Sequence, residues 1–148
     1  MISESEQFTL DIDWFFASRN KIGFVASAGG RLPRSIARSE ENIQLLSDYF
    51  RSLPEISNVQ VNPLLEEILS HRKIDDSYLA DFVYMAEKGL YAFDKTFLNN
   101  FQDDMYHLVA KPLISLAFNS LPIDIIDILR ETMNDSDIET GFKISSFS

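Results

Sequence analysis

The sequence predicts an α+β fold in which a small antiparallel sheet opens with an N-terminal β-hairpin and packs with about four helices. Three observations support this fold. Residues 8–16 alternate in polarity as in a half-buried strand, residues 39–89 carry apolar side chains at helical spacing, and aromatic and β-branched residues return after residue 90. The 148 residues are 45% hydrophobic and 24% charged, which is typical of a globular chain. We therefore expect a single domain over residues 1–148.

The first two strands are predicted on either side of a short polar turn. The alternation over 8–16 would place five large apolar residues on one core-facing side: Phe8, Leu10, Ile12, Trp14 and Phe16. The polar run 18–21 contains Asn20, which tolerates left-handed backbone, and an apolar strand follows over 22–27. Gly29 and Gly30 end the hairpin in a permissive loop.

Four helices are predicted from their caps and their apolar spacing, over about 39–53, 62–69, 75–89 and 121–133. Ser39 is a good N-cap for the first helix, and Asn62 precedes Pro63 at the start of the second. The third follows an Asp-Asp pair and stops at Gly89, where a left-handed C-terminal residue is expected. Pro122 opens the last helix.

The sheet is expected to resume beyond the central helices. Aromatic and β-branched residues predict strands over 90–93 and 105–110, with an irregular connection over 94–104. After an acidic turn at 135–139, the alternation of Phe142 and Ile144 predicts a short closing strand.

Cysteine usage and the N-terminus indicate a cytoplasmic protein. The chain has no cysteine, which excludes disulfides, a thiolate nucleophile and cysteine-ligated metal sites. The first six residues are acidic and polar, whereas a signal peptide begins with basic residues followed by an apolar stretch. No segment is long and apolar enough to cross a bilayer, so we expect no stable membrane insertion.

Charge argues against nucleic acid as a direct ligand. The chain has 13 Lys and Arg against 23 Asp and Glu, for a net charge of −10, whereas phosphate binding requires an excess of cations. The charge is unevenly distributed. Five bases and no acid lie between residues 14 and 39, which leaves −15 on the remaining residues. The acidic parts would attract a basic protein partner.

No motif in the sequence predicts catalysis, a metal or a cofactor. His71 lies near a helix end and His107 lies in an apolar strand, and neither accompanies a nucleophile or ligand motif. The loop at Gly29 and Gly30 matches neither the P-loop nor the Rossmann fingerprint, and the acidic turn lacks the glycine of a calcium loop, because Thr140 stands there. We therefore expect a protein that is not an enzyme and acts by binding.

Acidic clusters are the candidate contacts with a partner, and aromatic residues would pack at the centre of the interface. The twelve Phe, five Tyr and one Trp make a heavy aromatic content. The candidate contacts, chosen as local acid clusters, are Asp75, Asp76, Asp103, Asp104, Asp135, Asp137 and Glu139.

Two stretches carry a resemblance to a known family. They are Ile12-Asp13-Trp14-Phe15-Phe16 with Ile22-Gly23-Phe24-Val25-Ala26-Ser27-Ala28-Gly29-Gly30 and Leu32-Pro33, and Tyr106-His107-Leu108-Val109-Ala110-Lys111-Pro112 with Leu121-Pro122. This pattern resembles small bacterial immunity proteins that accompany polymorphic toxins, including toxins of contact-dependent growth inhibition. The turn departs from the family pattern, since Arg19-Asn20-Lys21 replaces a more usual Asp or Gly pair. The resemblance implies a stoichiometric inhibitor that binds its cognate toxin domain, possibly a nuclease, inside the producing cell.

Two other functions are compatible with the sequence. The chain could be a non-catalytic structural or adaptor subunit whose aromatic residues form a homo-oligomer and whose charge confers solubility. It could also be a small enzyme that uses one convergent pair of carboxylates, a hypothesis that requires the pair to lie in a cleft.

Overall fold

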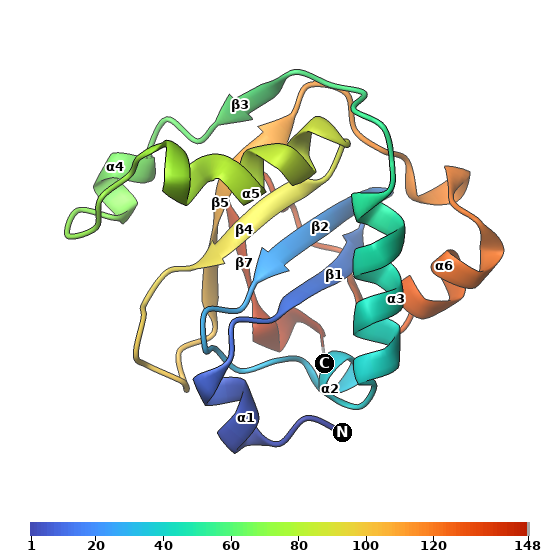
Figure 1. The fold of residues 1–148 in the computed structure, drawn as a ribbon, viewed down its shortest axis with the longest axis horizontal. Helices are drawn as coiled ribbons and strands as arrows, with labels where there is room; N and C mark the ends of the chain where they lie inside the picture. Colours follow the sequence, from blue (N-terminus) through green and yellow to red (C-terminus); the bar gives the residue numbers. More distant parts are fainter. Residues whose placement is uncertain (148) are drawn as a thin grey trace.

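One mixed sheet forms the centre of the protein (Figure 1) in the computed structural model, which describes residues 1–147. Over these residues the sheet has seven strands in the order β3-β5-β4-β2-β1-β6, and β7 pairs with β5 outside this path. The strands are β1 (Asp13–Ser18), β2 (Lys21–Ala26), β3 (Val59–Val61), β4 (Tyr91–Lys95), β5 (Met105–Pro112), β6 (Met133–Asn134) and β7 (Gly141–Lys143).

The α+β class is confirmed, but the prediction of a small antiparallel sheet is wrong in both size and strand direction. β1 pairs with β6 in parallel, and β2 pairs with β4 in parallel. The reason for the second pair lies in the connection. The chain leaves β2 and returns at β4 only after the central helices, and such a long crossover delivers a strand in parallel orientation.

Six α-helices accompany the sheet over residues 1–147, together with two short 3₁₀ helices. They are α1 (Glu4–Thr9), α2 (Arg34–Ala37), α3 (Glu40–Arg51), α4 (Leu65–Ile68), α5 (Asp76–Glu87) and α6 (Ile123–Leu129), with η1 (Phe118–Ser120) and η2 (Ile144–Phe147). The four predicted helices correspond to α3, α4, α5 and α6. The helix predicted from Asn62 is only four residues long, because the Asn62 side chain accepts a hydrogen bond from the Leu64 amide in a local turn.

The N-terminal hairpin is confirmed, and both central residues of its turn have a left-handed backbone conformation. β1 and β2 pair antiparallel from Asp13 opposite Ala26 to Ser18 opposite Lys21. Arg19 and Asn20 form the turn with φ of 49° and 66°, the left-handed conformation of both central residues that a two-residue hairpin turn requires. Asn20 adopts this conformation more readily than Arg19 does.

The first strand begins five residues later than predicted. Residues 4–9 form α1, whose start is fixed by a capping box in which Ser3 and Glu6 hydrogen bond to each other's main chain. Phe8 and Leu10 therefore lie outside the sheet and are 53% and 47% exposed. The placement of these two residues on the core face was wrong, since the helix turns them away from the strand alternation.

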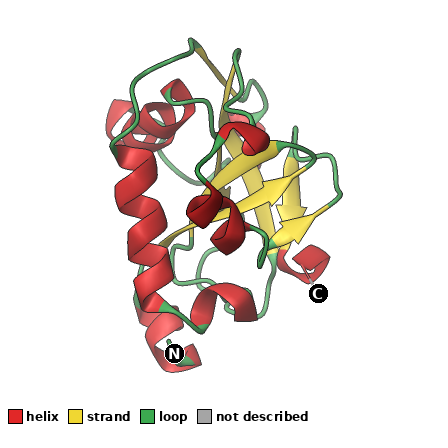
Figure 2. Cartoon of the chain, turned by 90° about the vertical axis from the view of Figure 1, so that its right-hand side faces the viewer, coloured by secondary structure: helices red, strands yellow, loops and turns green. Residues whose placement is uncertain are grey.

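Two apolar cores flank the sheet, which explains why β1 is buried on both sides. Phe15 faces the first core, where α3, α5 and α6 cover the sheet, and Trp14 and Phe16 face the second. Figure 2 shows the long helix on one side of the strands and the C-terminal turn on the other. The second core is closed by the loop that carries α2 and by the C-terminal segment, which buries Ile138 and Phe142.

The C-terminal region differs from its prediction in two places. The last helix ends at Leu129, and Met133 begins β6, where it pairs with Ala17 of β1. The predicted closing strand is confirmed as β7, although Ile144 lies in the following 3₁₀ helix. The segment between β6 and β7 leads from the edge at β1 to the edge at β5, and it covers the second face of the sheet.

Candidate functional site

A buried polar cluster lies between β4 and the start of α5. The Asp94 carboxylate accepts hydrogen bonds from the Tyr78 hydroxyl at 2.6 Å and from Arg72 Nη2 at 3.0 Å, and Asp94 is 3% exposed. Burial, followed by the charge of Asp94, raises the pKa of Tyr78 well above its usual value. Both partners of Asp94 come from the α4–α5 region, so the cluster holds the helical layer against the sheet.

His107 lies beside this cluster as a buried, hydrogen-bonded strand residue. It pairs with Asp94 across β4 and β5, and its Nδ1 shares a hydrogen bond of 2.9 Å with the Thr96 hydroxyl. Burial and the charge of Arg72 lower its pKa to about 4, so the imidazole is neutral at pH 7. His71 is exposed on the loop after α4. Within residues 1–147 neither imidazole has a nucleophile as a hydrogen-bond partner in an open cleft, since His107 is buried in β5 and its partner Thr96 directly follows β4.

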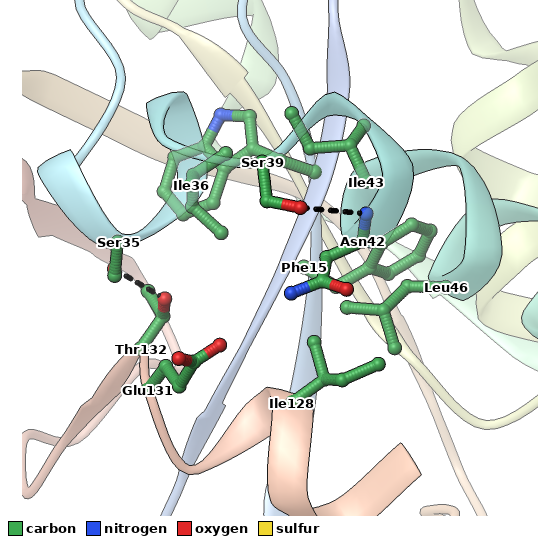
Figure 3. A pocket seen from close by; sticks show the side chains of 11 residues that line it. Phe15, Ser35, Ile36, Ser39, Asn42, Ile43, Leu46, Ile128, Glu131 and Thr132 are labelled. Carbon is green, nitrogen blue, oxygen red and sulfur yellow. Dashed lines mark hydrogen bonds between the residues drawn. The ribbon is translucent and has the colours of Figure 1, made fainter. Parts of the chain in front are cut away.

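A small cavity lies between α2, α3 and α6 (Figure 3), with a volume of about 10 Å³. The Ser39 hydroxyl caps α3 at one wall by accepting a hydrogen bond from the Asn42 amide, and Ser35 and Thr132 are hydrogen bonded at another. This volume is about that of one water molecule, so the cavity cannot hold an organic ligand.

Two carboxylates meet on the surface at the end of α5. A hydrogen bond from Glu55 raises the pKa of Glu87 at the end of α5. This is the type of pair that a carboxylate-dependent hydrolase would need, but neither residue lines the small cavity or the larger groove described below. In the part of the chain from 1 to 147, no group of three or more His, Asp or Glu side chains is placed to hold a metal ion.

The helices over the first core carry most of the exposed negative charge. Between them α3, α4, α5 and α6 contain ten acidic residues and a single base, Arg51. The acids are Glu40, Glu41, Asp48, Glu66, Glu67, Asp76, Asp81, Glu87, Asp124 and Asp127. Arg51 is occupied by Asp13 and Asp81. These four helices therefore carry nine more negative than positive charges.

Two of these helices form one continuous surface. α3 and α6 lie side by side (Figure 1), and the charge of Asp124 adds to the burial that raises the pKa of Tyr49 on α3. We define the α3/α6 surface by its exposed side chains: Glu41, Leu45, Asp48, Ile123, Asp124 and Asp127. Its four carboxylates have no ion-pair partner within residues 1–147. Leu45 is 39% and Ile123 67% exposed, so apolar contact area accompanies the charge.

The predicted contacts at Asp75, Asp76, Asp103 and Asp104 lie on two different elements and largely serve local structure. Asp75 is the N-cap of α5 and accepts the Tyr78 amide at 2.9 Å, while Asp76 is exposed in the first turn. Asp103 accepts the Met105 amide, and Asp104 accepts the Ser145 amide, at the start of β5.

The other three predicted contacts lie between β6 and β7. Asp135 pairs with Arg19, Asp137 accepts the Glu139 amide, and the Glu139 carboxylate bridges Lys21 and Lys111. Asp104 directly precedes β5, and Lys111 lies seven residues further along the extended chain, or roughly 23 Å away. The seven acids are therefore spread over separate places and do not form one cluster, and only Asp76 belongs to the acidic helical layer.

The sequence analysis missed the α3/α6 surface because its two helices are about eighty residues apart in the chain. One signal was available. Glu41, Leu45 and Asp48 follow at spacings of four and three residues, which places them on one face of a helix whose buried positions are Leu46 and Phe50. Selecting acids by adjacency in sequence favoured turns, whereas selecting them by helical spacing would have favoured this surface.

None of the helices described between residues 1 and 147 has the length and apolar content needed to cross a bilayer. Comparison of the chain with protein-family models, curated proteins and solved structures gives no match.

Proposed function

We propose that this protein is an immunity protein that binds a basic toxin domain through the α3/α6 surface and neutralises it in the cytosol of the producing cell. The observation that carries the proposal is a set of four carboxylates beside exposed Leu45 and Ile123 on two adjacent helices, with no ion-pair partner among the described residues. A negative surface with apolar contacts suits a positively charged protein, because charge steers the encounter and buried apolar area holds the complex. The resemblance to immunity proteins in residues 12–33 and 106–122 supports the same function.

The mode of inhibition follows from the expected partner. A nuclease-type toxin presents a cationic channel that binds phosphates. The carboxylates of the α3/α6 surface would occupy that channel in place of the nucleic acid and compete with the substrate. Inhibition would then weaken as salt is raised, since screening acts on both the encounter and the exposed ion pairs.

The test is a binding measurement with the protein encoded immediately upstream of this chain's gene. We expect capture of that protein, inhibition of its activity at a one-to-one ratio, and an affinity that falls with salt. The double variant D124K/D127K should bind at least tenfold more weakly. The control E66K/E67K makes the same change in net charge on α4, and it should change affinity less than threefold.

Three outcomes would contradict the proposed function or the proposed contact surface. Absence of binding to the neighbouring protein rejects the proposed function. Equal weakening by the two double variants rejects the α3/α6 surface as the contact, because only total charge would then matter. Catalytic turnover by the purified chain itself would favour the carboxylate-enzyme hypothesis instead.

One observation favours a second candidate function, that of a homo-oligomeric adaptor. Phe8 and Phe97 are 53% and 51% exposed, and Phe8 meets Phe101 edge to face with ring centroids 6.1 Å apart. Aromatic side chains are enriched in protein interfaces. If the Phe8–Phe101 pair joins copies of this chain, light scattering will report a dimer that Phe8→Ser dissociates; a monomer at all concentrations excludes the adaptor function.

A further inference from the structure

A groove lies beside α2, between the N-terminal segment and the C-terminal turn η2. The N-terminal segment, the loop leading into α2 and the C-terminal turn η2 enclose a volume of about 820 Å³, which is in the range of small-molecule sites. Its walls are formed mainly by Ile2, Gln7, Arg31, Arg34, Ile144 and Phe147. The groove is thus distinct from the α3/α6 surface, and the inference below does not depend on the proposed function.

Hydrogen bonds fix the walls of this groove. Buried Gln7 donates Nε2 to the Ile2 carbonyl at 3.0 Å and accepts the Leu32 amide at 2.9 Å. The Ile2 amide donates to the Ala37 carbonyl at 2.7 Å. These bonds hold the N-terminal segment against the loop that carries Arg31 and Arg34, so the groove exists before any ligand arrives.

Both arginines of the groove lack an acidic partner in the described part of the chain. Within residues 1–147, neither Arg31 nor Arg34 has a carboxylate in ion-pair contact, although acids outnumber bases by 23 to 13. Within the described residues the Nε of Arg31 is moreover buried without a hydrogen-bond partner. Because protein covers this atom, an oxyanion in the groove would bind the terminal Nη groups of the guanidinium, in the two-pronged geometry of charge-assisted hydrogen bonds.

A buried lysine lies near Arg31. Lys95 is 1% exposed, and its Nζ donates to the Asp103 carbonyl at 2.6 Å. Burial lowers the pKa of Lys95, the charges of Asp103 and Asp104 raise it, and the charge of Arg31 lowers it. An anion bound at Arg31 would relieve the part of the repulsion between Arg31 and Lys95 that the two carboxylates leave uncompensated.

We infer that this groove binds a small organic oxyanion, a phosphate monoester or a carboxylate, with its charged head on Arg31 and Arg34 and its apolar body on Leu32 and Phe147. Two acids limit the ligand's charge. Glu4 lines the groove, and so does Glu131, which is paired with Arg38. A ligand with one anionic head is therefore favoured over a polyanion, and this excludes a nucleic acid strand.

The experiment is a titration followed by nitrogen–proton NMR, which detects arginine Nε–H groups directly. Phenyl phosphate and benzoate are added separately to the full chain, with inorganic phosphate and benzyl alcohol as probes of the head and the body alone. Saturable shifts of the Arg31 and Arg34 Nε–H signals by phenyl phosphate or benzoate are expected. The stronger of the two ligands identifies the head group, and each isolated probe should bind at least tenfold more weakly.

Two groove variants and one control variant keep the test decisive. Arg34 is exposed and its replacement should leave the fold intact, so Arg34→Gln is expected to weaken binding at least tenfold. Arg31→Gln should abolish it, and Arg130→Gln, an exposed arginine outside the groove, should have no effect. Linear shifts without saturation, or equal binding by the Arg34→Gln and Arg130→Gln variants, would overturn the inference.

Discussion

Phe142 stacks on Tyr106, with ring centroids 5.2 Å apart and planes only 4° from parallel. The two residues are partners across β7 and β5, and Trp14 of β1 meets Phe142 edge to face at 5.9 Å. The C-terminal strand thereby joins the aromatic core that the first strand begins. These aromatic rings help to close the second core. The first core, on the other face of the sheet, is covered by a layer of helices instead.

Replacement of Phe142 by alanine should therefore destabilise the whole fold. The side chain is 8% exposed and contacts five aromatic rings, so its removal leaves a cavity that costs about 3 to 5 kcal/mol in the free energy of unfolding. Urea denaturation followed by circular dichroism measures this loss. Phe97→Ala removes the same group from a 51% exposed position and should change stability by less than about 0.5 kcal/mol. Similar losses in both variants would show that the C-terminal strand is not part of the cooperative unit.

The elements that sequence reasoning predicted well are those defined by local signals. Ser39 and Asp75 cap α3 and α5 through their own side chains, and the hairpin turn at Asn20 has the expected left-handed backbone. These features depend on interactions within three or four residues, and they can be recognised without knowing the rest of the fold.

Features that depend on distant contacts were not predictable in the same way. The capping box of Ser3 and Glu6 is a local signal, but the alternation over 8–16 concealed it, since two patterns overlap at Phe8. The direction of β4 follows from the path of the chain through the helices, and β6 is a two-residue strand that pairs with the distant β1. The α3/α6 surface exists only once tertiary packing brings the two helices together.

Buried His107 predicts a specific loss of stability in mild acid. Its folded-state pKa of about 4 lies below the usual value of 6.5, so the unfolded chain binds the proton more tightly. Stability should therefore fall as pH decreases from about 6.5 towards 4, by about 2 kcal/mol between pH 7 and pH 5. The folded state opposes protonation because the imidazole is buried near the positive charge of Arg72.

Denaturation at several pH values, with a matched pair of variants, isolates this contribution. His107→Gln keeps a polar group near Thr96 but cannot take up a proton, so its stability should change less between pH 7 and pH 5 than that of the parent chain. His71→Gln alters an exposed imidazole and should retain the parent's pH dependence. If both variants keep the full acid sensitivity, another group is responsible.

Glu139 provides the sharpest contrast between a structural acid and a contact acid. Its carboxylate accepts hydrogen bonds from Lys21 at 2.8 Å and Lys111 at 3.1 Å, and the bond from Lys21 lowers its pKa. Two cations thus already satisfy the charge that the sequence analysis assigned to partner binding. The site is about one-third exposed, so solvent screening limits its contribution, and Glu139→Gln should cost less than about 1 kcal/mol in stability.

The same variant distinguishes between the two assignments of the binding surface. If Glu139 only joins β2 to β5, Glu139→Gln will leave affinity for the toxin domain unchanged, while D124K/D127K weakens it at least tenfold. An affinity loss in Glu139→Gln as large as that of the double variant would place the contact at the acidic turn between β6 and β7. Because replacing one carboxylate with an amide preserves side-chain shape, such a loss would have to come from charge, and raising the salt concentration should then reduce the difference between Glu139→Gln and the parent chain.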